Sequence, residues 1–358
     1  MGRLKSALLF VLQSMVVGLA VAFLIVLIRP DLLPGIATRS GGASSYADAV
    51  AQSAPSVANV YTTRLVQYSP PEEERPRFRI ENSFGSAVVI DSEGYLVTNY
   101  HVVAQAAEII VQMPNGASAN GELVGVDAET DLALLRVDLG TLPAIALGNS
   151  AQLRVGDVVL AIGNPYGLTA SVTQGVVGGK GRVIPSTLTT FQDYIQTDAA
   201  INAGNSGGAL INISGELVGI NTAILAQDAQ TEGIGFAIPV DLVRGVVEEL
   251  KIHGRVIRGY MGFEPDTITD AERSAAGIES NVGILLSEVF EDGPAHAADL
   301  RSGDIILEIN GVRILSDRQA RTIVAGASPG DEVDIVALRN GEELRVTVTV
   351  AERPGAPD

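Results

Sequence analysis

The chain has 358 residues, with 42 acidic side chains against 24 basic ones and no cysteine. At about 150 residues per domain, this length predicts two folded domains. The formal net charge of −18 argues against binding nucleic acid through its phosphates. Without cysteine, disulfides, thiolate catalysis and cysteine-ligated zinc are excluded, and the 3 histidines leave little material for another metal site. We therefore expect no metal and no cofactor, and the 39 glycines favour a body of strands and turns.

The amino-terminal region has the pattern of a membrane anchor. Residues 7–28 carry no charge, and only Gln13 and Ser14 interrupt the apolar run. A helix of this length covers the hydrocarbon core of about 30 Å. A cleaved signal peptide is the alternative, but its apolar region is usually shorter and ends at small residues. We expect a single-pass transmembrane helix with residues 1–6 in the cytoplasm, because Arg3 and Lys5 precede it.

The following region predicts a tether and a first domain rich in strands. Residues 29–45 are rich in Pro, Gly and Ser, which is typical of a flexible tether. Residues 68–83 combine prolines with charges and predict an exposed loop, while the apolar spacing in residues 241–253 predicts a closing helix. Short β-like runs separated by turn signals occur at residues 57–63, 85–90, 95–99, 108–113, 133–137 and 157–162. This spacing favours a barrel or sandwich over alternating strands and helices.

The pattern of strands begins again after Gly254. Strands are expected at residues 282–289, 305–309, 333–339 and 342–350. The last two flank Asn340-Gly341, a dipeptide suited to a tight hairpin turn. Residues 255–352 therefore form a second domain of ordinary size, and residues 353–358 form a short tail.

The motif GNSGG at residues 204–208 is the most informative stretch of the chain. Glycines on both sides of Ser206 let the backbone turn sharply and let a substrate carbonyl approach main-chain N–H groups. The N–H groups of Gly204, Asn205 and Ser206 could then form an oxyanion hole. Alone the motif is ambiguous, because glycine-flanked serines are also common in ordinary turns.

Two residues upstream supply what a serine nucleophile needs. A serine hydroxyl is a poor nucleophile until a base accepts its proton, and the imidazole of His101 can take that role. Asp131 opens an otherwise apolar strand and is suited to orient the imidazole. Each residue taken singly is more often structural. Together, in the order His101, Asp131, Ser206, they indicate a catalytic triad.

Six stretches resemble the HtrA family of trypsin-like serine proteases. The three catalytic blocks are TNYHVV at 98–103, TDLALL at 130–135 and GNSGGAL at 204–210. Further family-like stretches are AIGNP at 161–165, QTDA at 196–199 and EGIGFAIP at 232–239. The resemblance implies a mainly β chain, with a chymotrypsin-like double β-barrel over residues 46–253 and a PDZ domain over residues 255–352. It also implies a homotrimer.

One PDZ domain behind an uncleaved anchor most resembles the DegS-type subgroup of membrane-anchored stress sensors. This resemblance implies a serine endopeptidase of the inner membrane with its folded domains in the periplasm. The expected activators are C-terminal peptides of misfolded outer-membrane proteins that bind the PDZ domain, and the expected substrate is a membrane-spanning anti-sigma factor. Two alternatives stay open: a general periplasmic quality-control protease, and an inactive PDZ scaffold or chaperone.

The resemblance also assigns a peptide-binding loop in the second domain. Its residues are Tyr260, Met261, Gly262 and Phe263. Successive backbone N–H groups can hold a terminal carboxylate while an extended peptide adds to the sheet edge. The alternative is that these side chains are ordinary core residues of a first strand.

Two further expectations concern regulation and specificity. Residues 178–190 would relay occupancy of the PDZ domain to the active site, with Arg182 as the electrostatic contact or, alternatively, as a solvated surface charge. Neither Ala200 nor Ile201 brings a charge to the primary specificity pocket, so we expect preference for a small aliphatic side chain. The nearby Asp198 is expected to tie down a loop.

Overall fold

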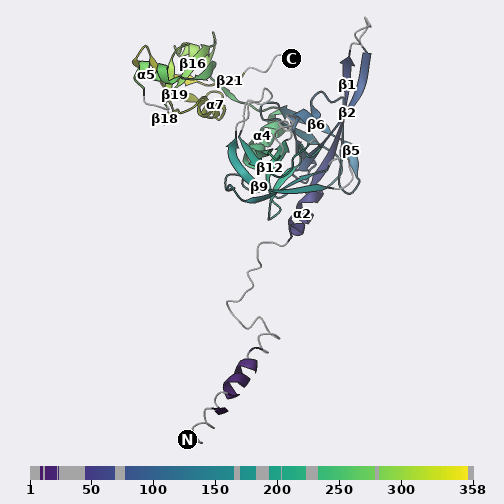
Figure 1. Ribbon diagram of the computed structural model, residues 1–358. Coiled ribbons are helices and arrows are strands. Elements are labelled where there is room, and N and C mark those ends of the chain that lie inside the picture. The colour runs from purple at the N-terminus through teal and green to yellow at the C-terminus, as the bar shows by residue number, and fades with distance from the viewer. Residues whose placement is uncertain are drawn as a thin grey trace, which may run out of the picture. The chain divides into compact units, whose positions relative to one another are not determined.

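The computed structural model describes residues 9–10, 13–21, 23, 45–68, 77–164, 170–182, 193–202, 204–222, 233–278 and 282–353. Two compact units make up the chain, Met1–Asp48 and Ala49–Asp358 (Figure 1).

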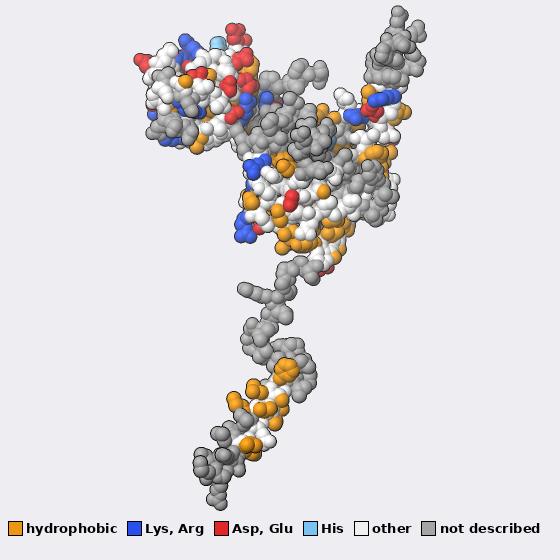
Figure 2. Space-filling model, viewed as in Figure 1, with side chains coloured by type: hydrophobic (Ala, Val, Ile, Leu, Met, Phe, Trp, Pro, Cys, Tyr) orange, Lys and Arg blue, Asp and Glu red, His pale blue; other side chains and the backbone are white. Residues whose placement is uncertain are grey.

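The first unit contains the segment expected to anchor the chain. Residues 9–10, 13–21 and 23 are helical with exposed side chains, and Figure 2 shows hydrophobic groups along this stretch. Among the described residues, no helix is long and apolar enough to span a membrane. The remainder of residues 7–28 and nearly all of the tether lie outside the described residues, so the anchor and the tether stay predictions.

The first barrel of the second unit is a seven-stranded sheet with the order β5-β4-β1-β2-β3-β7-β6. Helices α2 (Ala47–Ser53) and η2 (Ala54–Ser56) lead into it, and its strands are β1 (Val57–Tyr68), β2 (Arg77–Val89), β3 (Tyr95–Thr98), β4 (Glu108–Gln112), β5 (Ser118–Asn120), β6 (Glu122–Asp127) and β7 (Leu132–Arg136). Alternate residues of the central strands face inward and form one apolar core, which includes Val60, Val89 and Leu135. All six strands expected in the first domain are present, although several begin or end one or more residues away.

The prediction of a loop over residues 68–83 was wrong for its second half. β2 begins at Arg77 and pairs with β1 along its whole length, so the two strands run side by side (Figure 1). The register places Leu65 opposite Ile80 and Tyr61 opposite Phe84. These apolar cross-strand pairs stabilise a ladder that the neighbouring charges and prolines do not reveal in the sequence.

The second barrel is closed, with the order β10-β13-β12-β11-β8-β9. Its strands are β8 (Val158–Gly163), β9 (Ser171–Arg182), β10 (Tyr194–Thr197), β11 (Ala209–Asn212), β12 (Leu217–Thr222) and β13 (Gly235–Pro239). Its core includes Val159, Ile195 and Leu210, all almost fully buried. Closure removes the unpaired sheet edge and leaves the loops at the barrel end as the places for chemistry.

Helix α4 (Val240–His253) joins the two barrels. It packs on β12 and β13 of the second barrel and on β6 and β7 of the first. Its buried side chains recur at helical spacing, as expected for residues 241–253. Gly254 ends the helix at φ 70°, and a side chain at Gly125 of β6 would collide with its carbonyl, so the backbones meet closely there.

The second domain has the sheet order β15-β16-β17-β19-β20, with β18 on β17 and a separate β14-β21 pair. Its elements are β14 (Gly259–Tyr260), β15 (Phe263–Thr267), α5 (Asp270–Ala276), β16 (Ile284–Val289), α6 (Pro294–Ala297), β17 (Ile305–Ile309), β18 (Val312–Arg313), α7 (Asp317–Ala325), β19 (Glu332–Arg339), β20 (Glu342–Thr349) and β21 (Ala351–Glu352). Asn340 and Gly341 both have positive φ, 51° and 86°, which confirms the predicted hairpin turn.

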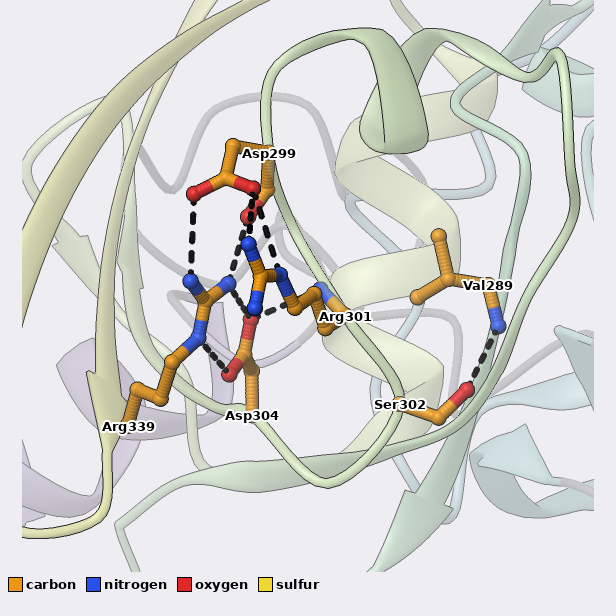
Figure 3. Close-up of polar contacts among 6 residues, drawn as sticks. All are labelled: Val289, Asp299, Arg301, Ser302, Asp304 and Arg339. Atoms are coloured by element: carbon orange, nitrogen blue, oxygen red, sulfur yellow. Dashed lines mark hydrogen bonds and ion pairs between the residues drawn. The ribbon is translucent and has the colours of Figure 1, made fainter.

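An arginine of β19 fixes the turn before β17. Arg339 donates to both carboxylate oxygens of Asp304, each at 2.8 Å, and pairs with Asp299 at 3.1 Å (Figure 3). Arg301 also holds Asp299, at 2.8 Å. Asp304 raises the pKa of the Arg339 guanidinium above its already high value, so Arg339 stays charged at every physiological pH.

Candidate active site

His101 lies on the short helix α3 (Tyr100–Val103), directly after β3. Three contacts hold this turn: the N–H of Tyr100 donates to the carbonyl of Asp131 at 3.1 Å, Thr62 Oγ1 donates to the carbonyl of Val102 at 3.2 Å, and Gly85 leaves room for the Val102 side chain. The His101 side chain is one-third exposed. The imidazole is therefore anchored by its backbone and open to a substrate.

Asp131 is buried and faces His101. Its carboxylate lies 2.8 Å from His101 Nδ1 and accepts the backbone N–H of His101 at 3.0 Å and the hydroxyl of Thr222 at 3.2 Å. The backbone has φ 58°, and its carbonyl accepts the side-chain amide of Asn99 at 3.0 Å. Asp tolerates this left-handed conformation better than most residues. A carboxylate at Nδ1 favours the tautomer that leaves Nε2 as a proton acceptor.

Ser206 lies in a turn between β10 and β11 and is almost fully buried. Gly204 and Gly207 have φ 105° and 79°, the conformations for which flanking glycines were expected. A side chain at Gly207 would lie 2.2 Å from the carbonyl of Ser86. The close approach of β2 thus explains the glycine after the nucleophile.

Ser86 of β2 connects the first barrel to this turn. Its N–H donates to the carbonyl of Ser206 at 2.8 Å, and its hydroxyl donates to the carbonyl of Gly204 at 2.8 Å. The same hydroxyl accepts the N–H of Asn164 at 3.0 Å. Ser86 is fully buried, so these bonds are shielded from water. Ser86 could not be found from the sequence, because a single serine in a strand carries no signal of its own.

One of the three N–H groups expected to form an oxyanion hole is already bonded. The N–H of Asn205 donates to the carbonyl of Asn202 at 3.1 Å, so it is occupied within the turn. Gly204 and Ser206 remain as the expected donors. The Asn205 side chain has a different role, since its amide bonds the carbonyl of Ala200 at 3.1 Å and the N–H of Asn202 at 3.0 Å.

The residues expected near the specificity pocket lie beside this turn. Ala200 is exposed, while Ile201 is buried at 6% exposure. Asp198 accepts the N–H of Val176 at 2.7 Å, which confirms that it ties β9 to the segment before the nucleophile. The preference for a small aliphatic side chain stays a prediction.

Arg182, at the end of β9, donates to the side chain of Gln196 on the neighbouring strand β10 at 2.9 Å. This bond lies within the second barrel. Residues 183–190 of the expected relay loop lie outside the described residues. The regulatory role of Arg182 therefore stays a prediction.

The predicted peptide-binding loop connects β14 to β15. The carbonyls of Met261 and Gly262 accept the N–H groups of Ala295 and Phe290 at 2.7 and 2.9 Å. In a planar trans peptide the N–H points away from the C=O of the same peptide group. The N–H groups of Gly262 and Phe263 therefore point away from Ala295 and Phe290, which bond the carbonyls of these peptides. The side chains of Met261 and Phe263 belong to the hydrophobic core, as the alternative interpretation expected. Their burial does not prevent the backbone N–H groups of the loop from binding a terminal carboxylate, which stays a prediction.

Arginines at the junction of the two domains hold the segment before Asp131. Arg258, which directly precedes β14, makes a two-pronged ion pair with the buried Asp127 and a 3.2 Å contact with Glu129. Arg353 pairs with Glu129 at 2.7 Å. The hydroxyl of Thr130 also donates to Asp127. The residues just before the catalytic carboxylate are thus bound to the second domain.

Comparisons with known proteins agree with this architecture. A family model described as a trypsin-like peptidase domain matches residues 85–220, and a PDZ domain model matches residues 259–350. Serine endoprotease DegS of Escherichia coli (strain K12) is 38% identical over 354 residues, covering 96% of this chain and 98% of the relative. The chain belongs to the HtrA family of trypsin-like serine proteases.

Other relatives show where the likeness is partial. A probable periplasmic serine endoprotease, DegP-like, of Pseudomonas putida (strain F1) is 39% identical over 300 residues, and this chain spans only 62% of its length. Among solved structures, the HtrA-type protease AlgW with decapeptide has a TM-score of 0.77 at 44% identity, covering 87% of this chain and all of that one. A serine endoprotease from Yersinia pestis has a TM-score of 0.69 at 40% identity, covering 87% of this chain and 99% of that one.

Proposed function

We propose that this chain is a serine endopeptidase of the periplasm, anchored in the inner membrane and activated through its PDZ domain. The observation that carries the proteolytic part is the His101–Asp131 pair, with Nδ1 bonded to a buried carboxylate that Thr222 also contacts. An ordinary surface histidine needs no buried carboxylate bonded to Nδ1 for its stability. Buried carboxylates with this set of donors are typical of serine-protease triads.

Each residue then has a defined step. Ser206 attacks the scissile carbonyl as His101 accepts its proton, and His101 later returns that proton to the leaving amine. Asp131 keeps the imidazole oriented and stabilises its charged form. The N–H groups of Gly204 and Ser206 stabilise the oxyanion of the tetrahedral intermediate. His101 then takes a proton from a water molecule, which attacks the acyl group on Ser206 and releases it as the second peptide, so that the serine hydroxyl is restored. The products are two peptides, and no cofactor enters these steps.

Regulation is proposed from similarity rather than from geometry. The likeness to DegS extends over nearly the whole chain, including its single PDZ domain, and AlgW has been solved with peptides. We therefore propose that C-terminal peptides of misfolded outer-membrane proteins activate the enzyme. The proposed substrate is a membrane-spanning anti-sigma factor, and the proposed assembly is a homotrimer.

Ser206→Ala tests the proteolytic claim. The purified full-length protein should cleave a protein substrate, and the variant should lose cleavage while keeping its unfolding temperature and its affinity for peptides. Adding a panel of C-terminal peptides to the wild-type protein should raise the cleavage rate. Cleavage that survives in Ser206→Ala would contradict the triad, whereas an unchanged rate with every peptide would contradict only the regulation.

A general quality-control protease is the second candidate, favoured by the similarity to DegP-like proteins. Such an enzyme would degrade an unfolded model protein without any activating peptide. The regulated enzyme should cleave that protein only slowly until a peptide is added. An inactive scaffold would bind peptides and cleave nothing under either condition.

A further inference from the structure

A pocket between β15 and α7 lies at the predicted peptide-binding loop. Its lining is mostly apolar and includes Tyr260 and Phe263 of the loop. Three lining residues are charged: Glu264, Arg321 and Arg353. In an apolar pocket the charged groups decide which ligand is accepted.

Two of the three charges satisfy each other. Arg321 of α7 donates to Glu264 of β15 at 3.0 Å and also contacts the carbonyl of Pro265. Arg353 has no partner among the pocket residues that the structure describes; it pairs instead with Glu129 of the protease domain. The pocket therefore contains one cation whose counter-ion lies outside it.

The ion pair of Arg353 is one that can exchange. Its side chain is 38% exposed and that of Glu129 25%, and ion pairs this open to water contribute little to stability. Glu129 keeps a second cation, Arg258, at 3.2 Å. The departure of Arg353 would thus leave no carboxylate without a partner.

Arg353 is also within electrostatic reach of the loop. Burial raises the pKa of the Tyr260 hydroxyl and Glu264 raises it further, while the positive charge of Arg353 opposes both. A backbone bond from the N–H of Arg353 to the carbonyl of Arg258, at 3.1 Å, fixes the origin of the side chain beside β14. Arg353 also lines the pocket together with Tyr260 and Phe263, so its side chain borders the space that a ligand at the loop would occupy.

We propose that Arg353 is a carboxylate-recognition residue of the PDZ pocket, exchanging Glu129 for the terminal carboxylate of a bound peptide. This inference rests on the proposed binding of C-terminal peptides. The carboxylate then receives a charge-assisted bond from Arg353 in addition to the backbone N–H groups of the loop. Since Glu129 stands two residues before Asp131, the exchange links occupancy of the pocket to the segment that carries the catalytic carboxylate.

The test compares two forms of one peptide on the full-length Ser206→Ala protein, which cannot consume it. Fluorescein-labelled ten-residue peptides with varied apolar C-termini are screened by fluorescence anisotropy, and the tightest binder is then made as a free carboxylate and as an amide. Arg353→Gln should weaken binding of the carboxylate form about 5–10-fold and leave the amide form unchanged. Arg353→Lys should restore part of the affinity.

Two further variants serve as counterparts. Glu129→Gln should tighten binding of the carboxylate form about 2–5-fold, because Arg353 no longer has to leave a charged partner. Arg321→Gln combined with Glu264→Gln removes the other ion pair of the pocket without changing its net charge, and should affect both forms of the peptide equally. Unfolding temperatures confirm that each variant is folded.

The outcomes separate this inference from the proposed function. If the wild-type protein binds no peptide, or binds carboxylate and amide forms equally, recognition of C-termini fails and the inference fails with it. If the wild-type protein prefers the carboxylate and Arg353→Gln keeps the full preference, the proposed function stands and the role of Arg353 is overturned.

Discussion

Two carboxylates in this protein are buried almost equally, Asp131 in the protease domain and Asp304 in the PDZ domain, at 3% and 2% side-chain exposure. Both accept several hydrogen bonds, yet their partners differ in chemistry. Asp304 is held by Arg339, whose charge is permanent (Figure 3). Asp131 is held by a histidine and a hydroxyl. A permanently charged partner such as Arg339 forms a structural ion pair with its carboxylate. A partner that can gain and lose a proton, such as His101, can act as a general base.

Of the substitutions that test this difference between the two carboxylates, Asp131→Asn should have the largest effect, which is on kcat. The amide presents a donor to His101 Nδ1 and favours the wrong tautomer, so kcat should fall by about 10⁴-fold. The N–H of Tyr100 and the side-chain amide of Asn99 both donate to the backbone carbonyl of this residue and not to its carboxylate, so the fold should be retained. Steady-state cleavage and thermal unfolding measure the two quantities. A kcat within tenfold of wild type would contradict the assigned role.

Asp304→Asn makes the same chemical change at the other carboxylate. It removes the charge opposite Arg339, which is three-quarters buried, and should lower the free energy of unfolding of the PDZ domain by about 2–4 kcal/mol. Basal cleavage at a temperature where the variant is folded should be unchanged. Urea denaturation followed by circular dichroism gives the free energy of unfolding. A loss below about 0.5 kcal/mol would show that the Arg339–Asp304 ion pair is not needed for stability.

Thr222→Val has a smaller expected effect on the catalytic carboxylate. Valine keeps the shape and removes the 3.2 Å hydrogen bond to Asp131, so kcat should fall about tenfold with little change in KM. Thr222→Ser keeps the hydroxyl and should restore most of the rate. If both variants lose the same activity, Thr222 contributes packing rather than the hydrogen bond.

Local motifs predicted the elements whose signal is contained in a few neighbouring residues. The turn at Asn340, the helix α4 and the turn around Ser206 are of this kind, because glycine, apolar spacing and hairpin dipeptides act over short range. The bond from the N–H of Asn205 to the carbonyl of Asn202 could not be predicted in this way, because it depends on how the turn closes. The loop expected over residues 77–83 was wrong, because cross-strand pairing outweighs local composition.

Contacts between distant segments could not be predicted from the sequence. Arg258 and Asp127 are 131 positions apart, and Thr222 is 91 positions from Asp131. Nothing in the composition of either segment distinguishes these residues from other charged or hydroxyl side chains. Their roles follow only from the meeting of the two barrels and the PDZ domain, which brings their segments together.

The central claim is that Ser206, His101 and Asp131 act as one nucleophilic centre. The most direct measurement is covalent labelling of the purified full-length protein with a fluorophosphonate probe, with the modified residue located by mass spectrometry. We expect labelling at Ser206 alone, lost in Ser206→Ala and strongly slowed in His101→Ala and Asp131→Asn. Absence of labelling with and without activating peptides, or equal labelling in His101→Ala, would contradict it.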